Sequence, residues 1–243
     1  MFKHETQVIK FLLQWYSMNA RKLPWRKKNN LNLPYPYFVF VSEYMLQQTT
    51  VNTVKNKFNE FILKWPSLNK LAQTSEPNIL KFWSGLGYYS RARNLLKSAK
   101  IIKNNFKNKI PETYDELILL PGIGDYTAKA ILGIGYNKSV MPLDANIERI
   151  LVRLHAIDKP INKVKNKLKD LGKKFISDKY SSNLIQSFMD YGSEICLPRN
   201  PKCNICGINK FCQSYKKNLQ QKIPLKLKKK TTKPIKYTIA YVI

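Results

Sequence analysis

Apolar residues recur at helical spacing along most of this 243-residue chain, and this periodicity restricts its fold more than any other feature. The clearest runs extend from Val8 to Tyr16, from Val51 to Ile62 and from Leu95 to Ile102. Apolar side chains three and four residues apart share one face of a helix, whereas a strand alternates them every second residue. Alternation of the strand kind is absent before residue 235. The pattern predicts an all-α fold.

Prolines and caps place the other expected helices. Pro36 suits a first helical turn because proline has no amide hydrogen to donate, so a helix is expected over residues 37–48. Further helices are expected over residues 77–83, 90–106, 126–135, 145–155, 163–177 and 182–195. No segment has the length and apolar content of a membrane span or a secretory signal, so we expect a cytoplasmic protein without membrane contact.

The charge balance points to a polyanionic partner. Lys and Arg number 43 against 15 Asp and Glu, which gives a net charge of +28. AT-rich codon usage raises the lysine content, yet it does not explain the scarcity of acidic residues. Nucleic acid is the partner that this charge favours, and an anionic membrane surface is second.

All four cysteines, Cys196, Cys203, Cys206 and Cys212, fall within one short segment with the spacing C-x6-C-x2-C-x5-C. This crowding excludes a disulfide framework spread over the chain and favours a metal centre in a reducing compartment. Four thiolates suit either structural zinc or an iron-sulfur cluster, and the spacing leaves both open. Arg199, Lys202 and Lys210 make the segment basic, which suits phosphate contact.

A glycine-rich connection and two carboxylates carry the other chemical signals. Residues 119–128 join two expected helices through Gly122, Ile123 and Gly124, which fits an ordinary turn or a clamp on a phosphate backbone. Asp144 precedes a helical run and could simply be its N-cap. Paired with Glu43, it could also serve glycoside hydrolysis, where one carboxyl group protonates the leaving group and an ionised one stabilises the cation.

The blocks at residues 23–26, 42–49, 83–95, 119–128, 143–146 and 189–192, together with the cysteines, resemble the MutY-type adenine DNA glycosylases of the helix-hairpin-helix, iron-sulfur superfamily. The resemblance implies a two-lobed helical fold. Residues 30–136 would form the lobe with the hairpin, and residues 1–29 and 137–218 the lobe with a 4Fe-4S loop at 196–212. Residues 219–243 would be a basic linker and the first strand of a C-terminal domain that the chain mostly lacks. The implied protein is a monomer acting on double-stranded DNA with an adenine mispair in the bacterial cytoplasm, at the nucleoid.

The resemblance also implies roles for single residues. Glu43 would protonate adenine, Asp144 would stabilise the sugar cation, and Tyr126 and Asn146 would support Asp144. Arg26 and Gln186 would line the pocket for the flipped base, and Gln48 and Tyr88 would insert into the duplex. The remaining DNA-binding residues would be Gln47, Thr49, Gly85, Gly87, Arg91 and the hairpin residues 122–124. The cysteines would bind the 4Fe-4S cluster.

Three alternatives stay open. Endonuclease III-type enzymes need a lysine nucleophile where this chain has Tyr126, and Lys129 would emerge elsewhere on that helix. Thymine-mismatch glycosylases of the same superfamily share the glutamate and the tyrosine, but residues 47–49 favour adenine. An iron-sulfur DNA-binding module without catalysis is the third alternative, against which both intact carboxylates argue. Loss of the C-terminal domain is expected to spare adenine excision and to weaken the preference for 8-oxoguanine opposite the adenine.

Overall fold

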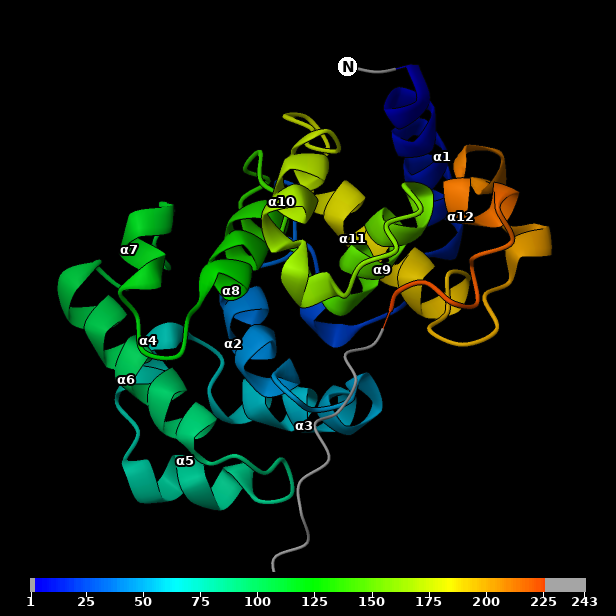
Figure 1. Ribbon diagram of the computed structural model, residues 1–243. Coiled ribbons are helices and arrows are strands. Elements are labelled where there is room, and N and C mark those ends of the chain that lie inside the picture. The colour runs from blue at the N-terminus through cyan, green and yellow to red at the C-terminus, as the bar shows by residue number, and fades with distance from the viewer. Residues whose placement is uncertain (1–2, 226–243) are drawn as a thin grey trace, which may run out of the picture.

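The computed structural model describes residues 3–225, and the regular elements in that range are all helical (Figure 1). The one extended feature in this part of the chain is an isolated antiparallel bridge between Lys28 and Pro34. The expected all-α class is therefore confirmed for these residues. The strand expected near the C-terminus and most of the basic linker lie outside the described residues. No helix between residues 3 and 225 is long and apolar enough to cross a membrane.

One group of helices comes from the first half of the chain. Its members are α2 (Pro36–Leu46), α3 (Val51–Lys64), α4 (Leu68–Ala72), α5 (Glu76–Trp83), α6 (Ser90–Asn105), α7 (Tyr114–Ile118) and α8 (Asp125–Ala130). Helix α6 packs against α2, α4 and α5, and α7 packs against α8. The buried aromatic rings of this group include Phe58, Phe61 and Trp83.

A second group joins the N-terminal helix to the last third of the described chain. It contains α1 (Lys3–Asn19), α9 (Ala145–Leu154), α10 (Lys165–Lys173), α11 (Ser181–Glu194) and α12 (Gln213–Lys216). Helix α11 packs against both α1 and α9, and α9 also contacts α10 and α12. Short 3-10 turns complete the path at η1 (Pro24–Arg26), η3 (Ile161–Lys163), η4 (Cys203–Ile205) and η5 (Asn209–Phe211).

The π-helical segment η2 (Ile131–Gly135) connects the two groups, because it packs against α2 and α8 on one side and α11 on the other. The single helix expected over residues 126–135 is thus divided, with α8 ending at Ala130. Close packing explains one glycine here, since a Cβ on Gly133 would overlap the side chain of Ile185 in α11. Such π-helical turns are frequent at functional sites.

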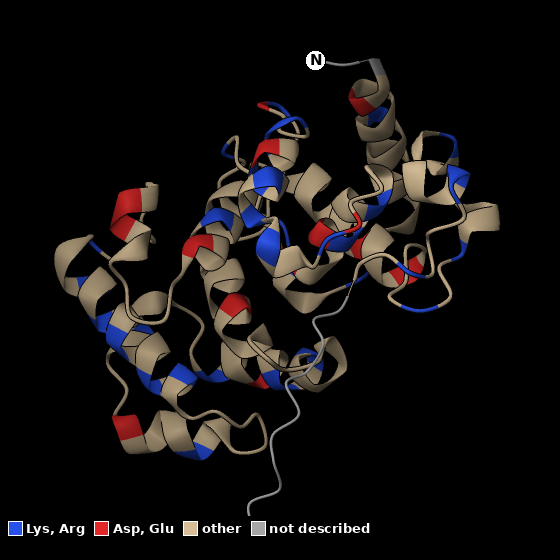
Figure 2. Cartoon of the chain, viewed as in Figure 1, with Lys and Arg blue, Asp and Glu red and all other residues tan. Residues whose placement is uncertain are grey.

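Helix α2 ends earlier than the sequence pattern predicts. Its last residue is Leu46 rather than Gln48, because the backbone of Gln48 turns into the left-handed region with φ of 56°. Tyr35 precedes Pro36 at the start of α2 and makes no capping hydrogen bond with its side chain. Basic residues are dispersed over both helix groups, including the length of α6, whereas acidic residues are sparse (Figure 2).

Candidate active site

A cavity of about 340 Å³ lies where the two helix groups meet at η2. Its walls come from η1, α2, α8, the start of α9 and α11. It brings together most of the expected catalytic and base-binding residues, namely Arg26, Glu43, Gln47, Thr49, Tyr126, Asp144, Asn146 and Gln186. Residues separated by more than a hundred positions in sequence therefore share one small space.

Glu43 is the acidic group whose ionisation is most strongly altered in this cavity. It lies on α2, and only 7% of its surface is exposed. Burial raises the pKa of Glu43 to about 8, a hydrogen bond from Tyr126 opposes this rise, and the charge of Asp144 adds to it. Desolvation penalises the ionised carboxylate, so Glu43 carries a proton at neutral pH. A carboxylic acid in that state can donate a proton to a leaving group.

Asp144 differs from Glu43 in its hydrogen-bond partners. It caps α9, where Oδ1 accepts the backbone N–H of Ile147 at 2.7 Å and Oδ2 accepts the Asn146 amide at 2.9 Å. Burial raises the pKa of Asp144 above its usual value, and these hydrogen bonds and the Arg149 charge offset only part of that rise. Donors directed at both oxygens favour the ionised form. The cap and the proposed catalytic role are thus compatible in one residue.

Tyr126, on α8, interacts with both carboxyl groups. Its hydroxyl is hydrogen-bonded to Glu43, and burial, followed by the charges of Glu43 and Asp144, raises its pKa well above the usual value. Tyr126 is therefore a neutral hydrogen-bond donor in this cavity. Lys129, one helical turn further, lines a different cavity and forms an ion pair with Asp125 at 2.8 Å. No amine from α8 enters the space between the carboxyl groups.

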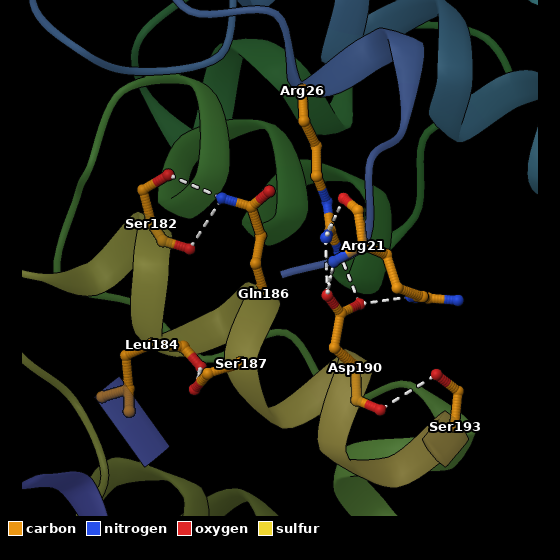
Figure 3. A network of polar contacts seen from close by, with 8 residues as sticks. All are labelled: Arg21, Arg26, Ser182, Leu184, Gln186, Ser187, Asp190 and Ser193. Atoms are coloured by element: carbon orange, nitrogen blue, oxygen red, sulfur yellow. Dashed lines mark hydrogen bonds and ion pairs between the residues drawn. The ribbon is translucent and has the colours of Figure 1, made fainter. Parts of the chain in front are cut away.

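Arg26 is fixed in the cavity wall by an aspartate to which the sequence analysis gave no role. Asp190 of α11 is fully buried and accepts two hydrogen bonds from Arg26 and two from Arg21 (Figure 3). Burial raises the pKa of Asp190, but the hydrogen bonds and charges of the two arginines outweigh it and bring the pKa below the usual value. The available sequence signal for this group was an acidic residue between the apolar residues Met189 and Tyr191 in the expected helix 182–195.

Gln186 lies one turn before Asp190 on α11, and its two amide atoms differ in their contacts (Figure 3). Nε2 donates to the carbonyl oxygen of Ser182 at 3.1 Å and is 3.2 Å from the hydroxyl of the same residue. Oε1 is buried and has no hydrogen-bond partner among the described residues. An unsatisfied buried acceptor is costly, which makes this atom a candidate for binding a ligand N–H group.

Two loops beside the cavity present the residues expected to insert into DNA. Residues 47–49 follow α2 and residues 84–89 follow α5. Gln48 is exposed at the tip of the first loop, and Tyr88 has 62% of its surface exposed in the second. Gly85 and Gly87 take φ values of 89° and 70°, which glycine adopts without the steric cost that a side chain adds. Gln47 Nε2 donates to the Gly122 carbonyl at 3.2 Å and ties the first loop to the hairpin.

Arg91 does not lie where direct DNA contact requires it. Only 6% of its surface is exposed, and its guanidinium group is surrounded by backbone carbonyl oxygens. The guanidinium group of this residue, which was expected to bind DNA, is thus occupied by contacts within the protein. The sequence could not show this, because an arginine at a helix start, next to Ser90 and near another arginine, is typical of an exposed cation.

The hairpin glycines have different conformations. Gly122 has φ of 81°, and a Cβ there would lie 3.0 Å from atoms of Asn94 and Tyr44, so glycine is required for two reasons. Gly124 has an ordinary φ of −106° and open space around its Cβ position. Its lack of a side chain leaves the backbone accessible to a ligand rather than permitting a turn. Ile123 between them is buried.

The four cysteines line one small cavity of about 30 Å³ between α9 and the segment that follows α11. Two neighbouring side chains donate hydrogen bonds to sulfur: Tyr191 to Cys206 at 3.2 Å and Arg153 to Cys196 at 3.3 Å. Within residues 3–225, however, no group of three or more His, Cys, Asp or Glu side chains is arranged to hold a metal ion. The fold gathers four soft sulfur donors without placing them as ligands of one centre. Their chemistry fits a thiolate-bound metal group.

Helix α9 joins the cysteine segment to the candidate active-site cavity through an arginine that the sequence analysis did not identify. Arg149 donates to Asn146 Oδ1 at 2.8 Å and to the Cys196 carbonyl oxygen at 2.7 Å. Asn146 in turn donates to Asp144. The i, i+3 spacing of Asn146 and Arg149 places both on one helix face, but only the fold brings Cys196 to it.

Residues 41–174, which contain this cavity and the hairpin, match the HhH-GPD superfamily of base excision DNA repair proteins. The chain belongs to this superfamily. Among individual members it is similar to the adenine DNA glycosylase of Buchnera aphidicola from Schizaphis graminum, with 43% identity over 90% of the chain. It is also 34% identical, over 92% of the chain, to the human adenine DNA glycosylase. It spans 62% of the length of the first of these relatives and 42% of the second.

Solved structures of the superfamily share the fold. A thermostable thymine-DNA glycosylase aligns with a TM-score of 0.79 and 26% identity, over 88% of this chain and 98% of that one. An endonuclease III in a non-covalent DNA complex aligns with a TM-score of 0.70 and 19% identity, over 90% of this chain and all of the other. The HhH-GPD architecture expected from the sequence is confirmed by these likenesses.

Proposed function

We propose that the chain is a monofunctional adenine DNA glycosylase that hydrolyses the N-glycosidic bond of adenine mispaired with 8-oxoguanine or guanine. One observation carries the proposal: two buried carboxyl groups share one cavity but differ in their hydrogen-bond donors. Glu43 is buried with a pKa near 8, while Asp144 accepts two N–H donors. This difference divides the work of acid and cation stabiliser between them. Identities of 43% and 34% to adenine DNA glycosylases support the choice of base.

The base must leave the duplex to reach this cavity, because the bond to be cut is inside the stack. Arg26 and Gln186 are the polar groups of the wall that could hold the extruded base. The unsatisfied Oε1 of Gln186 is an acceptor, and the exocyclic amine of adenine is a donor. Arg26 is held by Asp190 with its guanidinium group at the cavity. A fixed acceptor and a fixed cation would orient adenine before the reaction begins.

Bond cleavage then follows from the two carboxyl groups. Glu43 donates its proton to a ring nitrogen of adenine, and the base leaves with the electron pair of the glycosidic bond. The sugar becomes an oxocarbenium-like cation that the Asp144 carboxylate stabilises. A water molecule attacks this cation, gives a proton to the Glu43 carboxylate and leaves an abasic site. Because Tyr126 has no amine and Lys129 is paired with Asp125, α8 offers no amine to form a Schiff base in this cavity.

Residues outside the cavity would hold the DNA. Gln48 and Tyr88 are exposed at the ends of their loops and are the side chains that we propose to enter the duplex beside the lesion. The accessible backbone at Gly124 would contact phosphate, and the net charge of +28 would strengthen binding to any sequence.

The cysteine segment is proposed to bind a 4Fe-4S cluster through Cys196, Cys203, Cys206 and Cys212. Such a cluster would cross-link the segment and hold its basic residues in place for phosphate contact. Hydrogen bonds from Tyr191 and Arg153 to sulfur would remain as outer contacts of the ligands.

The test is single-turnover excision on duplexes that carry adenine opposite 8-oxoguanine or opposite guanine. We expect alkali-labile abasic sites from both, and none from Glu43→Gln at equal affinity for DNA. A duplex with a thymine mismatch is the control for specificity. Preferential cleavage of that duplex would instead assign a thymine glycosylase, and DNA binding without any cleavage would assign an inactive module.

A further inference from the structure

Arg91 is a buried cation whose partners are neutral oxygen atoms. Among the described residues it has no ion pair with a carboxylate, and its guanidinium group lies 5.6 Å from the centre of the Trp83 ring. A buried charge without a counter-ion is costly unless hydrogen bonds replace water. Such a cost suggests a positional role for the residue.

The two terminal nitrogens of Arg91 bind different segments. Nη1 donates to carbonyl oxygens at the end of α2 and in the loop after it: Tyr44 at 3.2 Å, Met45 at 2.7 Å and Gln47. Nη2 donates to the Thr49 hydroxyl at 2.9 Å and to two carbonyl oxygens of the 84–89 loop, Leu86 at 2.7 Å and Gly87 at 3.1 Å. One planar group thus joins two loops that are almost forty residues apart in sequence.

These contacts adjoin two strained backbone positions. Gln48, with φ of 56°, lies between two residues that Arg91 binds, and Tyr88, with φ of 47°, directly follows another. A residue with a side chain adopts this left-handed conformation only where its surroundings impose it. Both positions carry side chains that are exposed at the loop ends, and the Tyr88 ring centre lies 5.7 Å from the Arg91 guanidinium group.

We propose that Arg91 is a positioning residue, which fixes the backbone of Gln48 and Tyr88 and the distance between them before DNA binds. The inference rests on the proposed function, in which these two side chains enter the duplex. Loops that are already in the binding conformation lose less entropy on association, so mispair binding gains affinity. A lysine would keep the charge but could not span both loops, since only the guanidinium fork has two separated nitrogens.

Hydrogen exchange of the DNA-free protein tests the positioning directly. In Arg91→Lys, the amides of residues 47–50 and 85–89 should exchange at least about tenfold faster, as expected for loss of a hydrogen bond to a charged group. Amides of α1 and α9 should be unchanged. Arg93→Lys, on the same helix in an exposed ion pair with Glu76, is the matched control and should exchange like the wild type. Unchanged exchange in both loops of Arg91→Lys would overturn the proposal.

Affinity measurements separate positioning from direct phosphate contact. For a positioning residue, Arg91→Lys should lose about tenfold in affinity for a mispaired duplex and little for a fully paired one. Equal losses on both duplexes in Arg91→Met, with wild-type behaviour of Arg91→Lys, would show a phosphate contact and refute positioning. If the Arg91 variants do not fold, Thr49→Val removes one acceptor of Arg91, together with the 3.4 Å contact of the Thr49 hydroxyl to the Leu86 carbonyl oxygen, and should still speed exchange in both loops. No change there would count against the proposal.

The hydrogen-exchange experiment uses the DNA-free protein, so its result does not depend on whether the chain excises adenine. If the wild type excised no adenine yet both loops loosened in Arg91→Lys, the proposed function would fail while the positioning role would stand. If the wild type excised adenine and exchange in both loops were unchanged in Arg91→Lys, the positioning role would fail while the proposed function would stand.

Discussion

Arg26 and Asp190 form a two-point ion pair in the wall of the candidate active-site cavity, with Nη1 2.7 Å from Oδ2 and Nη2 2.8 Å from Oδ1. This geometry fixes the plane of the guanidinium group, because both of its ends are held at once. Asp190 is fully buried, so water does not compete for the pair. The pair links η1, which follows the N-terminal helix, to α11 near the end of the described chain.

Removal of the carboxylate should destabilise the protein and release Arg26. Asp190→Asn would leave two cations without their shared counter-charge, and loss of one partner of a buried pair costs about 3–5 kcal/mol. We expect a large fall in the unfolding free energy by urea titration. Asp170→Asn is the matched control, because its partner Lys173 and Asp170 itself are exposed. Similar stability of the two variants would show that the pair does not hold this wall together.

Adenine excision should depend on pH through Glu43. Its pKa is raised to about 8, so the acid form predominates below that pH and is lost above it. The single-turnover rate should therefore be level near neutral pH and fall about tenfold per pH unit well above 8. A profile measured under saturating protein checks this. A rate that still rises above pH 9 would exclude Glu43 as the proton donor.

The folding stability should also depend on pH through Glu43, and the direction of this dependence follows from its raised pKa. Because folding raises the pKa of Glu43, its contribution is fully present below the unfolded pKa and is lost as pH rises toward 8. Glu43→Gln cannot ionise, so it should gain about 3 kcal/mol relative to the wild type at pH 7. Near pH 4.5 the two proteins should be equally stable. Thermal unfolding at both pH values distinguishes this from an effect of packing, which would be independent of pH.

Tyr126 should restrict the enzyme to base removal. Borohydride traps a Schiff base between an enzyme amine and an opened sugar, and the cavity offers no amine from α8. We expect no covalent product from the wild type, and a trapped complex from Tyr126→Lys. Efficient capture by the wild type would mean that another amine reaches the sugar. In that case Lys129→Ala would show whether its pair with Asp125 opens on DNA.

The cysteine segment should bind iron. We expect about four irons per chain and a brown colour after anaerobic purification, since four thiolates form the donor set. Cys203→Ser should reduce the iron content and make the 196–212 segment more susceptible to proteolysis. Stoichiometric zinc without iron would support a structural zinc site in its place.

Local sequence patterns were enough to predict the helical class and the positions of most helices, whereas the catalytic roles of Glu43 and Asp144 came from the resemblance to known glycosylases and stay predictions. Periodicity, proline positions and caps act over a few residues, so they can be read without a fold. These local patterns did not predict the helix boundaries that depend on contacts between residues far apart in the sequence. Helix α8 is followed by a π-helical turn that begins at Ile131, where α2 and α11 both pack against the chain. Helix α2 ends before Gln48, whose backbone is in the left-handed region.

The tertiary structure alone decided what each polar side chain does. The sequence shows two carboxylates, but only burial and the donors around them raise the pKa of Glu43 and direct two N–H groups at Asp144. Likewise Arg91 and Arg26 are both arginines near glycine or proline, yet one binds carbonyl oxygens of two loops and the other a buried aspartate. Solvation and partners depend on residues far away along the chain, and these meet only when it folds.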